Sequence, residues 1–324
     1  MTAAGRTGYC PRGKGSLSMP PLTIALGNYG LTKPIKQAGA DLGRLNLKFV
    51  EVDQIVPMMR RMCRGLEFDI CEMAFTTYVC ARAAGLPFTA IPVFVTRNFH
   101  HWAIFINTKS GIKEPKDLEG RKVGVNRGYT VTTGLWARGV LQTEYGVDLD
   151  KVTWVPTDDE HVAEFDAPKN VDYSFRGAKM QELLLSGKID AAIGEVGVDA
   201  PEVKPLLPNA RTDAFGYFRK TGIYPINHGV VIKDSVLKEK PGIADELYRA
   251  FVAAKAEYLK NLDKTEATTS WDIAAKVNKA VVGDPFPFGI EPNRKALEAI
   301  TQFAVDQKMV PRKFTVEELF VPAN

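Results

Sequence analysis

Short apolar runs alternate along the chain with longer runs of helical periodicity. Apolar runs of about four to eight residues, bounded by turn residues, predict buried strands. In the N-terminal part of the chain these runs lie at 22–26, 45–52, 68–75, 88–95 and 101–107. Helical spacing occurs at 55–66 and at 76–85, where Gly85 ends the second helix. This alternation predicts an α/β fold with a mostly parallel sheet covered by helices.

The same pattern restarts after residue 120. Further strands are predicted at 121–126, 152–157, 188–195 and within 220–237. Further helices are predicted at 129–146, 242–262, 271–281 and 293–307. The segment 158–175 has no clear period, so we expect it to be a loop insertion.

The length of the chain favours two lobes. It has 324 residues, whereas single cores rarely grow beyond about 250–300 residues. We predict that 21–107 and 218–324 form lobe one and that 108–217 forms lobe two, so that the chain crosses between the lobes twice. Residues 1–20, rich in Gly, Ser and basic residues, are predicted to be a disordered tail. Ligands of such folds bind at the interface of the lobes.

Composition and charge argue against several classes of partner. The 42 basic and 38 acidic residues are spread along the chain, without the basic block typical of nucleic-acid binding. No run approaches the roughly 18 apolar residues of a membrane span, and the N-terminus has no apolar signal region. Cys10, Cys63, Cys71 and Cys80 form no CxxC pair, which favours free thiols in a reducing compartment. We therefore expect a cytoplasmic protein that binds neither nucleic acid nor membrane.

Three of the four histidines lie near the predicted crossings. His100 and His101 are adjacent before a predicted strand, and His228 follows the return crossing. Neighbours on a strand point to opposite faces, so only one of the pair can face the cleft, and which one stays open. Histidine suits proton transfer because it titrates near neutrality. Glu72, at the end of a strand, is a candidate partner; the alternative is a helix-start charge favoured by the helix dipole.

A second group of side chains could hold an anionic ligand. Thr130, Thr132 and Thr133 surround a helix start after Gly128, where N–H groups and hydroxyls favour a carboxylate; simple N-capping is the alternative. Arg97 could pair bidentately with a second carboxylate, unless it is a solvated loop residue. The other candidates for substrate binding are strand-end residues or neighbours of the helix start: Asn28, Tyr29, Tyr129 and Glu195.

Several well-known motifs are missing from the sequence. It contains no GxGxxG after a strand, no P-loop, no GxSxG and no HExxH. A metal site built from Glu72, His228 and one of the paired histidines is conceivable, but nothing in the spacing demands it. We therefore predict that the protein uses no cofactor, and the question of a divalent metal stays open.

Longer blocks of sequence resemble a known family. They are FDICEMAFTTYV (68–79), AIPVFVTRNFHHWAIFIN (90–107), SGIKEPKDLEGRKVGV (110–125), GKIDAAIGE (187–195), FRKTGIYPINHGVVI (218–232) and GIEPNRKALEAITQF (289–303). Their order resembles the type 2 periplasmic-binding-protein fold, in the branch of the nitrate/taurine-type substrate-binding proteins of ABC transporters. More narrowly, the blocks resemble the 4,5-dihydroxyphthalate decarboxylases. The block at 110–125 is generic to the superfamily, and the histidine-containing blocks carry the narrower signal.

The resemblance implies a carboxy-lyase that converts 4,5-dihydroxyphthalate to 3,4-dihydroxybenzoate and CO2 by ring protonation in the cleft. His228 and one of the paired histidines would transfer protons, Glu72 would orient one of them, and the 129–133 helix start and Arg97 would hold carboxylates. The ligand would be a small aromatic carboxylate. Whether the chain forms a homo-oligomer stays open. The alternative is a non-catalytic solute-binding protein of an ABC-type transporter for a small organic anion.

Overall fold

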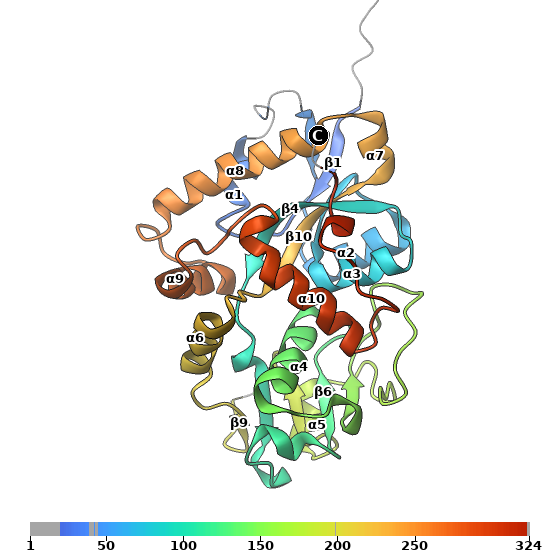
Figure 1. Cartoon of the computed structure of the whole chain (residues 1–324), viewed down its shortest axis with the longest axis vertical. Helices are drawn as coiled ribbons and strands as arrows, with labels where there is room; N and C mark the ends of the chain where they lie inside the picture. Colours follow the sequence, from blue (N-terminus) through green and yellow to red (C-terminus); the bar gives the residue numbers. More distant parts are fainter. Residues whose placement is uncertain (1–19, 39–41, 43–44, 198, 323–324) are drawn as a thin grey trace, which may run out of the picture.

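The computed structural model describes residues 20–38, 42, 45–197 and 199–322. Two five-stranded sheets form two lobes, one above the other in Figure 1. All but the last residue of the expected disordered tail, and with it Cys10, lie outside the described residues. Cys63, Cys71 and Cys80 are buried free thiols, as expected. Among the described residues, no helix combines the length and the apolar character needed to cross a bilayer.

The first sheet builds lobe one. Its strands are β1 (Leu22–Ala25), β2 (Leu47–Phe49), β3 (Ile70–Ala74), β4 (Phe88–Arg97) and β10 (Ile226–Lys233). They lie in the order β2-β1-β3-β10-β4, and only β10 runs antiparallel to its neighbours. All of β3 is buried because its two faces pack into different apolar clusters, Ile70 in one and Met73 in the other. The predicted mostly parallel, covered sheet is confirmed in this lobe.

The second sheet builds lobe two. Its strands are β5 (Ile104–Asn107), β6 (Lys122–Val125), β7 (Thr153–Pro156), β8 (Ala191–Ile193) and β9 (Val203–Pro205). They lie in the order β7-β6-β8-β5-β9, and β6 pairs in parallel with both of its neighbours. Between β7 and the next helix, residues 158–175 are all described and form no helix or strand, which confirms the predicted loop.

Helices cover both sheets, and one helix joins the lobes. They are α1 (Lys33–Ala38), α2 (Ile55–Gly65), α3 (Phe75–Ala83), α4 (Thr132–Tyr145), α5 (Met180–Leu185), α6 (Ala210–Thr221), α7 (Asp234–Glu239), α8 (Ile243–Asn261), α9 (Ser270–Val282) and α10 (Arg294–Asp306). α10 packs on α3 of lobe one and on α4 of lobe two (Figure 1). A Cβ at Gly139 of α4 would lie 2.3 Å from the Phe303 ring of α10, so glycine is what lets these two helices approach.

The boundary expected at residue 107 is corrected by the strand pairing. β5 pairs antiparallel with β8 and β9, so it belongs to the second sheet and not to lobe one. The residues in front of it form a 3-10 turn, η3 (His101–Ala103), rather than the start of a strand. The chain therefore changes sheets between β4 and β5, and it returns between α6 and β10. Periodicity could not show this, because a buried strand has the same apolar pattern in either sheet.

Candidate functional site

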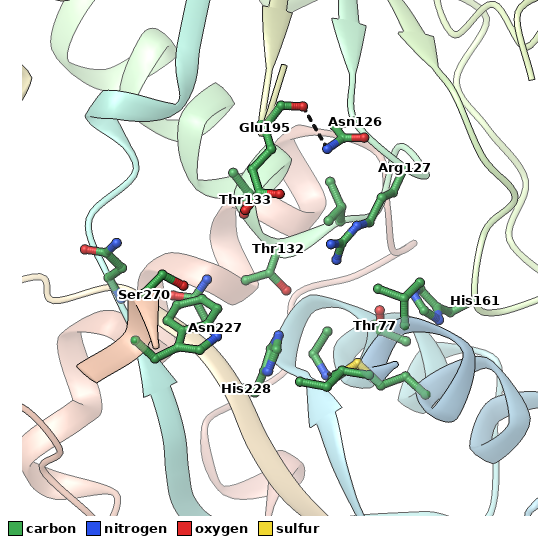
Figure 2. Close-up of a pocket in the computed structure, with 18 of the residues that line it drawn as sticks. Thr77, Asn126, Arg127, Thr132, Thr133, His161, Glu195, Asn227, His228 and Ser270 are labelled. Carbon is green, nitrogen blue, oxygen red and sulfur yellow. Dashed lines mark hydrogen bonds between the residues drawn. The ribbon is translucent and has the colours of Figure 1, made fainter. Parts of the chain in front are cut away.

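A cavity of about 500 Å³ lies between the two lobes and is lined by five of the twelve candidate residues: His100, Thr132, Thr133, Glu195 and His228. Figure 2 shows the side chains that project into it from both sides. Lobe one contributes strand ends and the starts of helices: Ala74, Thr77, Asn98, His100, Asn227, His228, Ser270 and Trp271. Lobe two contributes the ends of β6 and β8, the start of α4 and one loop residue: Asn126, Arg127, Thr132, Thr133, Gly194, Glu195 and His161.

His228, in the wall of this cavity, forms a hydrogen-bonded pair with Glu72, which is buried behind it. On the two antiparallel strands, His228 pairs with Ala74 and Val230 pairs with Glu72. His228 lies two residues from Val230, so it points to the same face as Glu72, at a diagonal that long side chains can span. The His228 Nδ1 lies 2.6 Å from the Glu72 Oε1. The sheet register therefore creates the pair.

Glu72 is fully buried and is held by two further donors. The Gly27 N–H donates to its Oε2 at 2.7 Å, and the Tyr29 hydroxyl donates to the same Oε1 that His228 uses. Burial and the Glu72 carboxylate raise the pKa of Tyr29 well above its usual value, so its hydroxyl stays a donor. A Cβ at residue 27 would lie 2.2 Å from the Tyr29 hydroxyl oxygen, which explains the glycine.

This arrangement fixes how His228 presents itself to a ligand. Because a carboxylate can only accept, the Nδ1 of His228 carries a proton and Nε2 is left for the ligand. The Trp271 ring lies beside the imidazole, with ring centroids 5.7 Å apart. The His228 side chain is 14% exposed, which gives a ligand in the cavity access to it. A histidine backed by a buried carboxylate is suited to general acid–base work.

The paired histidines point to different places. His100 lines the cavity, and its Nε2 lies 3.3 Å from the Oδ1 of Asn227. That oxygen also accepts from the Asn98 N–H, so Nε2 of His100 is the protonated nitrogen. His101 is buried against Tyr217 of α6 and does not line the cavity. Burial lowers the pKa of His100 to about 3 and that of His101 to about 4, so both rings are neutral near pH 7.

The predicted anion site at the start of α4 is partly filled by the protein itself. The Glu160 carboxylate accepts from the N–H groups of Tyr129 and Thr130 at 2.5 and 3.0 Å, and from the Thr130 hydroxyl at 2.6 Å. The Tyr129 and Thr130 side chains are buried and do not line the cavity, which corrects their expected role. Thr132 and Thr133, in the first turn of α4, do line it, so the part of this site open to a ligand begins at residue 132.

Three other predicted binding residues lie outside the cavity lining. Arg97 is fully buried, stacks on Tyr224 and donates to the Tyr224 carbonyl and to Asn293, because it joins the end of β4 to the returning chain. Asn28 is exposed and accepts from Lys36 at 2.7 Å. Tyr29 meets Glu72 rather than the cavity. Of the residues predicted to bind substrate, Glu195 does line the cavity, and its backbone carbonyl accepts from Asn126.

Two further basic side chains of the lining, Arg127 and His161, were not predicted from the sequence. Arg127 follows β6 with a left-handed φ of 80°, and its guanidinium makes no hydrogen bond or ion pair with any other described residue. Its place at the carboxyl end of a strand is a signal that could have identified it. His161 comes from the loop at 158–175, where no periodicity marks it. Burial, with the nearby Arg60 and Arg127, lowers the pKa of His161 to about 4.

The described ranges contain no group of three or more His, Cys, Asp or Glu side chains arranged to hold a metal. In the combination considered from the sequence, Glu72 is hydrogen-bonded to His228, and His100 is bonded to Asn227 instead. Among the described residues that line the cavity, Arg127 is the arginine, and Asp53 and Glu195 are carboxylates, so the place suited to a small organic anion is the part of the cavity beside Arg127.

Comparison with known proteins agrees with the fold and points to one group of enzymes. The NMT1/THI5-like family profile matches residues 68–261, more than half of the chain. The 4,5-dihydroxyphthalate decarboxylase of Comamonas testosteroni is 27% identical over 327 residues, which cover 95% of this chain and 98% of the relative. The same enzyme of Pseudomonas putida is 27% identical over 274 residues, which cover 82% of this chain and 92% of the relative.

A solved structure confirms the architecture. The periplasmic aliphatic sulphonate binding protein SsuA of Escherichia coli is 14% identical, with a TM-score of 0.55, over 94% of this chain and 98% of that chain. At this identity the likeness concerns the fold alone. The predicted two-lobed, periplasmic-binding-protein-like fold is thus confirmed, together with a distant relationship to the decarboxylases.

Proposed function

Because the chain belongs to the NMT1/THI5-like family, we propose that it is a carboxy-lyase acting on a hydroxylated aromatic carboxylate in the cleft between the lobes. The observation that carries this proposal is the buried Tyr29–Glu72–His228 array, which leaves one imidazole nitrogen for the ligand. Binding alone gives no reason to back a histidine with a fully buried carboxylate. The distant decarboxylase relatives support 4,5-dihydroxyphthalate as the first substrate to test.

The chemistry of such a substrate matches what the cavity offers. In 4,5-dihydroxyphthalate each carboxylate is para to a ring hydroxyl. Loss of CO2 would leave an aryl anion unless the ring carbon is protonated first, and a deprotonated hydroxyl makes its para carbon basic. The ring supplies its own electrons in this route, so the protein has to manage protons and hold charge.

In the proposed reaction, Nε2 of His228 takes the proton of the ring hydroxyl, and Glu72 stabilises the imidazolium that forms. The oxygen electron pair moves into the ring, and the para carbon takes a proton that solvent finally supplies. The bond from this carbon to the carboxylate breaks, CO2 leaves, and the electron pair returns to the ring. The product oxygen then recovers its proton from His228. One proton has replaced one CO2, so the step is balanced.

Lobe two would hold the carboxylates. Arg127 and the first turn of α4, with Thr132 and Thr133, face the cavity from the lobe opposite to His228 (Figure 2). The helix N-terminus and the guanidinium both favour a carboxylate. A para relation between carboxylate and hydroxyl then suits a ring that spans the cleft, with its hydroxyls toward His228.

The test is turnover of 4,5-dihydroxyphthalate by the purified protein, with CO2 release and formation of 3,4-dihydroxybenzoate as readouts. We expect H228N to abolish turnover while ligand still raises the melting temperature. H101N is the matched control, since it makes the same change at a histidine that is buried outside the cavity lining, and it should keep its activity. Ligand binding without CO2 release from the unchanged protein would refute the enzyme and favour the solute-binding alternative.

A further inference from the structure

His161 is placed in the cavity wall by a segment that has no regular structure. It belongs to the 158–175 loop of lobe two, its residue exposure is 8%, and its Nδ1 has no hydrogen-bond partner among the described residues. The ring therefore has no described side-chain bond at this nitrogen to fix its direction. The place of the ring in the cavity wall therefore depends on how the backbone of the loop is held and on the packing around the ring.

The backbone of this loop is held from the opposite lobe. On α2 of lobe one, the Nη2 of Arg64 donates to the Glu160 carbonyl at 2.8 Å, and its Nε donates to the His161 carbonyl at 3.4 Å. Arg60 lies one turn earlier on the same helix face, donates to the Asp159 carbonyl at 2.9 Å and pairs with Asp158 at 3.2 Å. Two arginines thus bind four consecutive residues across the cleft.

The same loop is also fixed within its own lobe. The Glu160 carboxylate accepts hydrogen bonds from the N–H groups at the entry to α4 and from the Tyr173 hydroxyl, the last at 2.8 Å. A Cβ at Gly128 would lie 2.6 Å from the Glu160 Oε2, so glycine is needed for this approach. Residue 160 is thereby fixed by its side chain to lobe two and by its carbonyl to lobe one, immediately before His161.

We propose that Arg64 is a positioning residue that acts through His161: it holds the loop backbone so that the imidazole of His161 stays in the cavity wall and contacts the bound ligand. Arg64 does not line the cavity, so its effect must pass through the loop. The ligand contact rests on the proposed function, whereas the coupling between Arg64 and the loop does not.

The first test needs no turnover. Amide exchange of peptides covering 158–166 is measured by mass spectrometry in the unchanged protein, in R64M and in R61M. R61M is the matched control, because Arg61 is the same residue type on the same helix but pairs with Glu67 within lobe one. We expect exchange to rise about ten-fold or more in R64M and to stay unchanged in R61M. Equal exchange in R64M and the unchanged protein would overturn the proposal.

The second test asks whether Arg64 acts through His161. Affinity for phthalate, which lacks the ring hydroxyls and cannot react by the proposed route, is measured by calorimetry for H161Q, R64M and the double variant. We expect each single variant to bind about ten-fold more weakly and the double variant to match H161Q within about two-fold. Additive losses would mean that Arg64 acts elsewhere and would overturn the proposal. Both tests are readable even if 4,5-dihydroxyphthalate is not turned over, so the two proposals can fail separately.

Discussion

Replacing Glu72 by glutamine is the most direct perturbation of the proposed chemistry. The side chain keeps its shape but loses its charge, and it is fully buried with its oxygens directed at Gly27, Tyr29 and His228. The Glu72 side chain does not line the cavity, so ligand contacts should survive. What changes is the environment of His228 at the moment when it carries a proton taken from the substrate.

The size of the effect follows from the geometry. With 2.6 Å between Nδ1 and Oε1, the centres of the two delocalised charges are about 4 Å apart. Two unit charges at about 4 Å interact by about 4 kcal/mol at an effective dielectric constant of about 20. Since about 1.4 kcal/mol is a factor of ten in rate, kcat should fall about 10³-fold. KM should stay within about three-fold, because the lost interaction is made mainly in the transition state.

The assay is steady-state release of CO2 from 4,5-dihydroxyphthalate, with E67Q as the control. Glu67 also loses a charge on substitution, but it lies on the surface and pairs with Arg61. A melting curve of each variant checks that the fold is intact. If E72Q keeps kcat within about ten-fold of the unchanged protein, the role given to the Glu72–His228 pair is wrong.

Three further predictions address binding, stability and pH. R127M should raise the Kd for phthalate about ten-fold or more, and added salt should reduce the difference from the unchanged protein; equal titrations of the two would contradict the carboxylate role of Arg127. E160Q should lower the free energy of unfolding by about 1–3 kcal/mol in denaturant titrations, because an amide faces N–H donors that the buried carboxylate satisfied; unchanged stability would contradict this. Burial lowers the pKa of His100 to about 3 and those of His101 and His161 to about 4, so below about pH 6.5 the unfolded chain binds more protons than the folded chain. As the pH is lowered from about 6.5 to about 4, the unfolding free energy should therefore fall by up to about 1.4 kcal/mol per pH unit for each histidine. Calorimetry that finds the unfolding free energy constant over this range would refute the buried neutral state of these histidines.

Local pattern predicted the long C-terminal helices, because their buried side chains repeat regularly, but α5, α6 and β9 had no predicted counterpart. The helices at 242–262, 271–281 and 293–307 correspond to α8, α9 and α10 within a residue or two. Assignment to a lobe failed at β5, since strand pairing is a long-range property that apolar content does not encode. At the paired histidines the turn η3 stands in place of the expected strand, and His100 lines the cavity whereas His101 packs against Tyr217 of α6.

Charge patterns predicted the wrong partner where the protein supplies its own counter-group. The α4 entry was recognised as an anion site, but the anion at residues 129–130 is Glu160, which lies in a loop without periodicity. Arg97 likewise donates to the Pro225 carbonyl and to the Asn293 amide oxygen, so its guanidinium is already occupied by the protein. A local sequence pattern identifies the kind of group that a site will bind, but only the fold determines whether the protein already fills it.

The Glu72–His228 pair depends on the register between β3 and β10, which brings together two residues 156 positions apart in the chain. Glu72 and His228 meet because Val230 pairs with Glu72, and a slip of one residue would turn His228 to the other face of the sheet. The chain of lobe two is inserted between these strands, so folding of the first sheet completes the pair and also brings Arg127 and the 158–161 segment over it. The proposed proton transfer, the proposed anion binding and the contact of Arg64 with the 160–161 carbonyls thus all depend on the pairing of β10 with β3 after the inserted lobe. Loss of the Arg64 contacts with the loop should therefore weaken the contribution of His161 to ligand binding, while the Glu72–His228 pair stays intact.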